Sequence, residues 1–330
     1  MKCKFFTVLH NLKVNENLGG GDKLGPIFRI TNDRKTIEDL LSSGVKEQIG
    51  ILETNALLSG DPVVICSLDM PNDMSPVEYL DLRIAQLQSF QFTMWLSKDH
   101  SVNTEMSYLT YQLPNDSWGI TSNFRSVQYR NANGKAEVVQ LTREHLKGIR
   151  NIWLAVFSPQ VDITLKYTRV RPDSPREERA IFFIGLARSA SDLAIKITLY
   201  CSAFETLLST AQTELAHQLS ERISFFLASN KSERHQIYKD VKEAYSVRSK
   251  IVHGSTLSAQ KISELSEISF RCDSYIRQLL LLILTNSNLN ELFKQPNGKF
   301  DDALIGMIMS NMCLSEVEGL GDLYKEIIEG

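Results

Sequence analysis

Cysteine is scarce in this chain of 330 residues, and no two of its cysteines form a CxxC pair. An odd, scattered set argues against a disulfide framework and against a zinc site, so we interpret the thiols as core residues. We therefore expect no metal and no cofactor. The cysteines are Cys3, Cys66, Cys201, Cys272 and Cys313.

Long hydrophobic runs are missing as well. The longest candidate, from Leu279 to Leu284, is far shorter than the roughly 20 residues that cross a bilayer. At the N-terminus, the apolar stretch in MKCKFFTVLH is interrupted by Asn11 and Lys13 before the core of a signal peptide can form. The sequence therefore predicts a cytoplasmic protein without a membrane partner.

The chain also lacks a strong charge of one sign, since its formal net charge is −3. Gly19–Gly21 lacks the GxxxxGK[ST] continuation of a phosphate-binding loop, and neither Ser202 nor Ser249 stands in a GxSxG frame. Locally, however, residues 231–250 hold six Lys or Arg against three acidic residues. Such a run is either a solvated helix face or a surface that faces phosphate, and both alternatives stay open.

Residues 1–170 combine strand and helix signals and are expected to form a mixed α/β domain. Ser75 and Glu78 flank a proline at the first helical position, which predicts a capped helix, and Thr142 predicts the start of another. The turn Asn133–Gly134 predicts a hairpin. Strands are expected within residues 4–14, 25–33 and 61–70. The role of this domain stays open between a sensor and a regulator.

Residues 171–330 are expected to form an all-α bundle, because helical patterns follow one another with short connections. The fold class predicted for the whole chain is therefore α+β. Short terminal helices are expected in FDDALIGMIM and GDLYKEII. The main helices are predicted at 175–208, at about 211–228, at about 232–252 and at about 258–285.

The stretch YSVRSKIVHGS, residues 245–255, places an arginine in an apolar pattern. Ile237, Val241, Tyr245, Arg248 and Val252 recur at helical spacing, so Arg248 falls on the stripe expected to face the core. An unpaired buried charge is very costly. Arg248 must therefore be paired or open into a cleft.

His253 follows Arg248 by five positions, and Gly254 is well placed to end the helix. One interpretation is structural: Arg248 forms a salt bridge with Glu205 or Glu221, and His253 caps the helix end. The other is functional: Arg248 binds a phosphate and His253 transfers a proton. The second suits cleavage of RNA, because its 2′-hydroxyl can attack its own phosphate without a metal.

The pattern Arg248-x4-His253 resembles the R-x4–6-H motif of the HEPN superfamily, the higher eukaryotes and prokaryotes nucleotide-binding domains. An AFETLL segment with Glu205 and a SERISFFLA segment with Arg222 precede it, in an order similar to the ApeA-like branch. The resemblance covers roughly residues 175–285. It implies a helical bundle that dimerises and acts as a metal-independent endoribonuclease in phage defence or as a toxin.

Carried over to this sequence, the resemblance implies that Arg248 and His253 are catalytic. The residues expected to contact RNA are Ser249, Lys250 and Lys242, and those expected to support the site are Glu205, Arg222 and Tyr245. The implied partners are RNA (tRNA or mRNA), a second copy of the chain, and a phage-derived trigger that acts through residues 1–170. Two alternatives remain: a HEPN fold that binds RNA or a nucleotide without cleaving, and a scaffold whose helices only dimerise.

His217 and His235 fall on different predicted helices, with no carboxylate or cysteine at ligand spacing. We therefore interpret both as surface or interface residues. Neither is expected to take part in the Arg248–His253 site.

Overall fold

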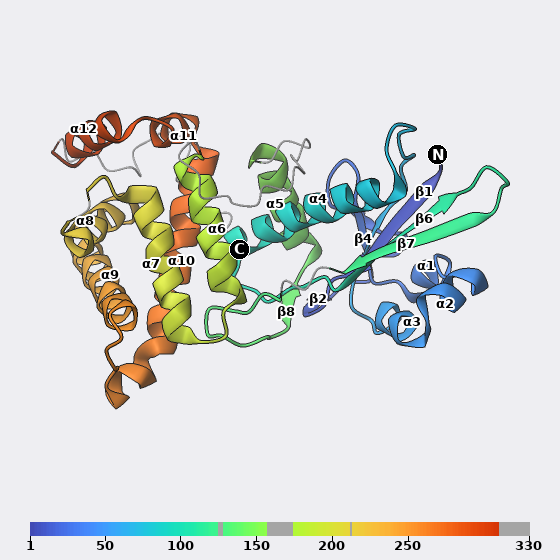
Figure 1. Cartoon of the computed structure of the whole chain (residues 1–330), viewed down its shortest axis with the longest axis horizontal. Coiled ribbons are helices and arrows are strands. Elements are labelled where there is room, and N and C mark those ends of the chain that lie inside the picture. The colour runs from blue at the N-terminus through green and yellow to red at the C-terminus, as the bar shows by residue number, and fades with distance from the viewer. Residues whose placement is uncertain (125–127, 157–173, 212, 310–330) are drawn as a thin grey trace. The chain divides into compact units, whose positions relative to one another are not determined.

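The computed structural model describes residues 1–124, 128–156, 174–211 and 213–309. These residues confirm the α+β class, with an antiparallel sheet in the first part of the chain and helices in the second (Figure 1). Contacts divide the chain into two compact units, which are described separately. The predicted domain boundary at residue 170 lies outside the described residues.

Unit 1 is built around an antiparallel sheet with the strand order β3-β4-β5-β1-β6-β7. Strand β1 lies inside the sheet, and Phe5 pairs with Cys66 on one side and with Leu109 on the other. A short parallel pair joins β2 to β8. The strands are β1 (Cys3–Val8), β2 (Leu12–Val14), β3 (Asp22–Lys23), β4 (Arg29–Thr31), β5 (Val63–Cys66), β6 (Met106–Gln112), β7 (Trp118–Phe124) and β8 (Val139–Leu141).

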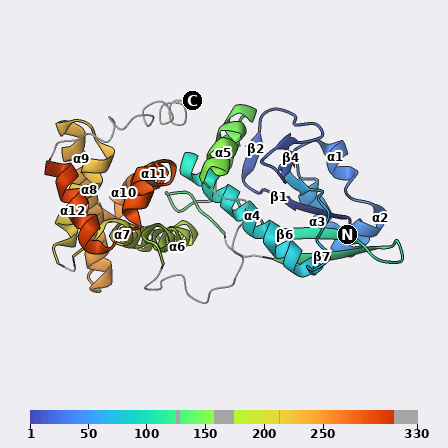
Figure 2. The same ribbon diagram turned by 90° about the horizontal axis from the view of Figure 1, so that it is seen from above.

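Helices cover both faces of this sheet (Figure 1, Figure 2). Because successive strand residues point to opposite faces, Phe5 packs in the core under α4 and α5, whereas Phe6 packs in the core under α1 to α3. The helices are α1 (Arg34–Glu38), α2 (Ser43–Ile49), α3 (Ile51–Leu57), α4 (Pro76–Ser97) and α5 (Arg143–Val156).

The predicted helix starts in unit 1 are confirmed. The backbone N–H of Ser75 donates to the Glu78 carboxylate over 2.9 Å, and the N–H of Glu78 donates to Ser75 Oγ over 3.3 Å. This is the reciprocal capping box expected from the sequence. At α5, the N–H of His145 donates to Thr142 Oγ1, and the N–H of Thr142 donates to His145 Nδ1. His145 therefore caps a helix.

The predicted hairpin around Asn133–Gly134 is wrong. Gly134 turns the chain with φ +79°, but the segment that follows, β8, pairs in parallel with β2. The reason is burial, because Val139 and Leu141 pack beside buried residues of β2. A hairpin forms instead between β6 and β7 across residues 113–117, where Asp116 takes the left-handed conformation with φ +61°.

Unit 2 is the helical bundle, and it also takes in Trp95–Asp99 and Arg130–Lys135 from earlier in the chain. Helix α7 packs against α6, α9 and α10 (Figure 1). None of the helices among the described residues is long and apolar enough to cross a membrane. The helices are α6 (Arg176–Ser189), α7 (Leu193–Leu208), α8 (Leu215–Leu227), α9 (Lys231–Val252), α10 (Ala259–Thr285), α11 (Ser287–Phe293) and α12 (Asn297–Met309).

The single long helix predicted over 175–208 is also wrong, because the chain reverses between α6 and α7. Ala190 is extended, and the Asp192 side chain accepts a hydrogen bond from the N–H of Ile195 over 2.9 Å. Asp192 thus starts a new helix, which packs back on α6. The predicted bounds of α9 and α10 are confirmed within one residue. The segment GDLYKEII lies outside the described residues.

A buried polar centre joins the parts of unit 2. Asp273 is fully buried and accepts hydrogen bonds from Trp95 Nε1, Tyr200 Oη and Arg277 Nε over 2.7–2.9 Å. Three donors, one of them charged, compensate for burying the carboxylate. Nearby, the buried Lys196 ammonium donates to the carbonyl of Ala187 over 2.7 Å. Burial lowers the pKa of Lys196 to about 8.

Candidate functional site

Arg248 lies at the edge of the buried face of α9. Ile237, Val241 and Val247 are buried against the other helices, the Arg248 side chain is 23% exposed, and Val252 is 53% exposed. The first residues of the predicted stripe are therefore buried, as expected. Val252, in the last turn of the helix, is exposed and departs from the prediction. Arg248 is neither fully buried nor free in solvent.

Of the two partners that the structural interpretation names for Arg248, Glu205 and Glu221, the structure has Glu205. Arg248 Nη2 lies 3.3 Å from Glu205 Oε1, which α7 supplies because it packs against α9. The guanidinium also lies over the ring of Tyr245, 5.2 Å from its centroid. Burial and then the Glu205 charge raise the pKa of Tyr245 to about 12, so near neutral pH its hydroxyl keeps its proton.

Arg248 uses only part of its donor capacity in this arrangement. Its Nε is buried and has no hydrogen-bond partner among the described residues, and its ion pair there is the one contact with Glu205. Arg271 on α10 differs, because its Nη1 contacts Asp240 and its Nη2 donates to Glu243 over 2.9 Å. A guanidinium has five N–H donors, so Arg248 keeps donors for another anion.

His253 is the C-cap residue of α9, so it lies at the helix end, as the sequence predicts. The N–H of Ser255 donates to the carbonyl of Lys250 over 2.8 Å, and the N–H of Gly254 donates to that of Ile251 over 3.2 Å. With Gly254 at φ +71°, these bonds form a Schellman motif. The His253 side chain is exposed, and no hydrogen bond or ion pair holds it among the described residues. It lies about 140° around the helix from Arg248 and makes no such contact with it.

The other predicted site residues fall into two groups. Lys242 and Lys250 are exposed and Ser249 is half-buried, all on α9 near the motif. Arg222 is 4% exposed and binds the carbonyl of Leu208 and the Asp301 carboxylate. Its contacts therefore hold the C-terminal end of α7, where a positive charge is favourable, and do not include Arg248.

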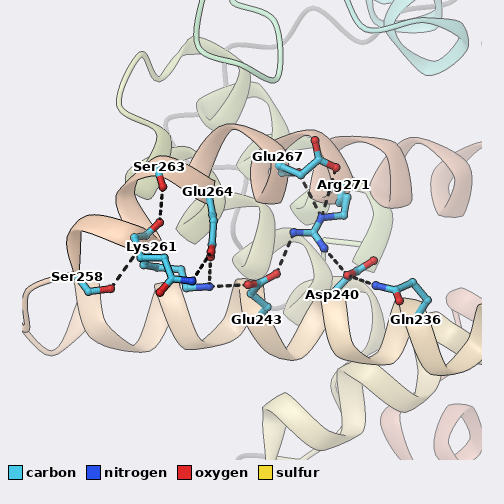
Figure 3. Close-up of polar contacts among 10 residues, drawn as sticks. Gln236, Asp240, Glu243, Ser258, Lys261, Ser263, Glu264, Glu267 and Arg271 are labelled. Atoms are coloured by element: carbon cyan, nitrogen blue, oxygen red, sulfur yellow. Dashed lines mark hydrogen bonds and ion pairs between the residues drawn. The ribbon is translucent and has the colours of Figure 1, made fainter.

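A network of ion pairs joins α9 to α10 beside the motif (Figure 3). Arg271 contacts Asp240 and Glu243, and Lys261 contacts Glu243 and Glu264 over 2.5–2.6 Å. Isolated surface pairs contribute little, but several charges that share partners act as a network. This network fixes the α9 segment that leads to Arg248 and His253.

Two surface hollows occur in the described part of the bundle. One, of about 540 Å³, is lined by Glu205 together with Arg176, Arg179 and Ser202. The other, the α8–α9 hollow, has a volume of about 730 Å³. It is lined by His217, Glu221, Ser224, Lys231, Ser232, Arg234, His235 and Tyr238. Arg248 and His253 line neither hollow.

The sequence does not predict that His217 and His235 lie in one hollow. Helix α8 packs against α9, which brings the His217 ring to 5.9 Å from the Tyr238 ring at an angle of 82°. The packing of two helices cannot be read from the spacing within either one. The sequence does indicate that His235, Tyr238 and Lys242 share one face of their helix, because they recur at helical spacing.

The assignment of this site depends on its own residues. Comparisons of the chain with protein-family models, with curated proteins and with solved structures give no match. In the part of the chain that the structure describes, no three or more His, Cys, Asp or Glu side chains gather in a way that could hold a metal ion. Near its C-terminal end, α9 offers a partly engaged arginine, the exposed His253 and the exposed Lys250.

Proposed function

We propose that this chain is a metal-independent endoribonuclease of the HEPN type, with Arg248 and His253 as its catalytic residues. One observation carries the proposal: Arg248 is 23% exposed and held by one 3.3 Å contact with Glu205, on the helix that ends at an exposed His253. Arg271, on the neighbouring helix α10, is by contrast engaged by two carboxylates, Asp240 and Glu243. The resemblance of residues 245–255 to the HEPN motif supports the same assignment.

The chemistry is a transfer within the RNA strand. The 2′-oxygen bonds to phosphorus while the bond from phosphorus to the 5′-oxygen breaks, which leaves a 2′,3′-cyclic phosphate and a 5′-hydroxyl. A base takes the proton of the 2′-hydroxyl, and an acid gives a proton to the departing oxygen. His253 supplies one of these roles, and Arg248 neutralises the charge that grows on the phosphate.

A homodimer supplies the second proton-transfer group. A two-fold interface places each residue near its symmetry mate, so His253 of the partner subunit can serve as the other acid or base. Apolar surface next to the motif supports this arrangement: Val252 is 53% exposed and Ile262 is 57% exposed, on either side of the turn between α9 and α10. The substrate we propose is tRNA or mRNA in the cytoplasm, in a defence or toxin setting, with unit 1 receiving a phage-derived trigger.

A non-catalytic RNA-binding HEPN fold is the second candidate. The observation that favours it is the Arg248–Glu205 ion pair itself, because that pair already gives the arginine a partner. In this case the chain binds RNA but releases it uncut.

An RNA-cleavage assay in the presence of a chelator distinguishes the two. We expect the wild type to release 2′,3′-cyclic phosphate ends and to leave DNA intact. His253→Ala should slow cleavage by a factor of about 10² to 10⁴, as expected for losing a general acid or base. His10→Ala, in unit 1, is the matched control and should cut normally. A requirement for magnesium, or normal cutting by His253→Ala, would exclude the proposed mechanism.

A further inference from the structure

One face of α9 carries aromatic and basic side chains along much of its length. His235, Tyr238, Lys242, Tyr245 and Ser249, here called the α9 track, follow one another at spacings of three and four residues. Residues at these spacings lie along one face of a helix. The track begins in the α8–α9 hollow and ends one turn before His253. At 1.5 Å per residue, His235 and His253 are about 27 Å apart along the axis.

The hollow at the start of the track holds more basic than acidic side chains. Lys231 and Arg234 line it together with the His217 and His235 rings, against one carboxylate, Glu221. Arg234 is held in place, because its Nε donates to the carbonyl of Ala228 over 3.0 Å and its guanidinium lies 5.2 Å from the Phe225 ring centroid. A positive hollow with a fixed arginine suits a phosphate group.

Each of the two aromatic rings of the track has a cation over it. Lys242 Nζ lies over the Tyr238 ring, 5.6 Å from its centroid, and the guanidinium of Arg248, next to the track, lies over the Tyr245 ring, 5.2 Å from its centroid. Both tyrosines are half-buried, so each ring is fixed on the helix and still has exposed surface. Single-stranded nucleic acids are bound by such pairs, because a base stacks on the ring while the cation neutralises the adjacent phosphate.

We propose that the α9 track binds single-stranded RNA, and that it leads the strand from the α8–α9 hollow to Arg248 and His253. This inference rests on the proposed function, since it names the form of RNA that the site accepts. Bases of a duplex are stacked on one another, so only an unpaired strand can stack on Tyr238. A stacked strand rises about 3.4 Å per nucleotide, so the track accommodates about eight nucleotides.

The test is a binding measurement with a labelled oligouridine of about twelve nucleotides, followed by fluorescence anisotropy. All variants carry His253→Ala, so that the RNA stays intact. Tyr238→Ala should raise the Kd by about tenfold or more, and Tyr238→Phe should restore binding because the ring remains. Lys242→Gln should reduce the slope of log K against log salt by about 0.7, the value for one phosphate contact on a single strand. Lys299→Gln, on α12, is the control and should change neither quantity.

Duplex RNA of the same length should bind more weakly than the oligouridine. The proposed track is wrong if duplex and single-stranded RNA bind equally well. It is also wrong if Tyr238→Ala folds and binds the oligouridine as tightly as the chain that carries His253→Ala alone. If Tyr238→Ala does not fold, the salt slope of Lys242→Gln decides, and an unchanged slope refutes the proposal. The two proposals fail separately. Tyr238-dependent binding in a chain whose wild type never cuts RNA refutes the nuclease alone. Unchanged binding by Tyr238→Ala in the His253→Ala chain, together with normal cutting by Tyr238→Ala in a chain that keeps His253, refutes the track alone.

Discussion

Two arginines in the bundle show how differently a guanidinium can be used. Arg271 binds Asp240 and Glu243 together and ties α10 to α9. Arg248 meets one oxygen of Glu205 at the edge of the same bundle. The first arrangement engages the planar fork on two carboxylates, whereas the second engages one terminal nitrogen on one carboxylate.

Replacing each arginine with lysine tests this difference. Lysine keeps the charge but loses the planar fork, so Arg248→Lys should fold normally and lose most RNA cleavage. Arg271→Lys should do the reverse, lowering the free energy of unfolding by about 1–2 kcal/mol while cleavage continues. Urea unfolding and initial cleavage rates measure the two effects. An Arg248→Lys variant that cuts like the wild type contradicts a bidentate phosphate role, and one that unfolds favours a structural salt bridge.

Lys196 predicts a dependence of stability on pH. Burial lowers its pKa from 10.5 to about 8 in the folded chain, so between these values the unfolded chain binds a proton that the folded chain has released. Stability from this group therefore rises with pH across that window, by up to about 1.4 kcal/mol per pH unit. Urea unfolding of the wild type and Lys196→Met should show this difference in slope. Lys299→Met, which removes an exposed lysine, should have the same slope of unfolding free energy against pH as the wild type. If Lys196→Met also has the wild-type slope, the prediction is contradicted.

At the scale of single elements, the end of α9 depends on one glycine. Gly254 has φ +71°, and a Cβ added there would meet no atom within 4 Å, so the cost of a side chain is conformational alone. Gly254→Ala should lower the free energy of unfolding by about 1 kcal/mol and should reduce cleavage, because His253 precedes the strained residue. Gly185→Ala, inside α6 with equally open surroundings, should instead raise stability by up to about 1 kcal/mol. Equal effects of the two changes would show that the Schellman end is unimportant.

The elements also show which sequence signals were sufficient. Helix α4 was predicted from its capping box, α9 from its apolar periodicity and the glycine at its end, and α10 from its helical pattern. The break between α6 and α7 was missed, because Asp192 reads equally well as an exposed helical residue until its side chain is seen to bond Ile195. The hairpin was misplaced, because an Asn-Gly turn fixes a reversal but burial chooses the partner strand.

The candidate site was predicted only in part from the sequence. The cost of an unpaired charge made a partner for Arg248 necessary, and the sequence named Glu205 among two candidates. The hollow that gathers His217 and His235 was not predicted, because it arises from the packing of α8 on α9. Interactions within a helix follow from spacing, whereas interactions between helices need the fold.

For the whole molecule, the proposed mechanism predicts a dimer whose axis passes near the end of α9. Ile262→Glu should shift the protein toward a monomer and reduce cleavage, because it places a charge on exposed apolar surface beside the motif. Ile305→Glu, on the exposed surface of α12, should change neither property. Sedimentation and cleavage rates provide the measurements. A wild type that cuts RNA as a monomer would contradict the prediction.

Unit 2 closes around residues that are far apart in the chain, and this affects how it is made. Trp95 Nε1 donates to Asp273 Oδ1 across 178 positions, and both side chains are fully buried. At about 5–20 residues per second, a ribosome adds Asp273 about 9–36 s after Trp95. A nascent chain therefore cannot complete the core of its helical unit until α10 has emerged. The unit that carries Arg248 and His253 is therefore completed only late in the synthesis of the chain.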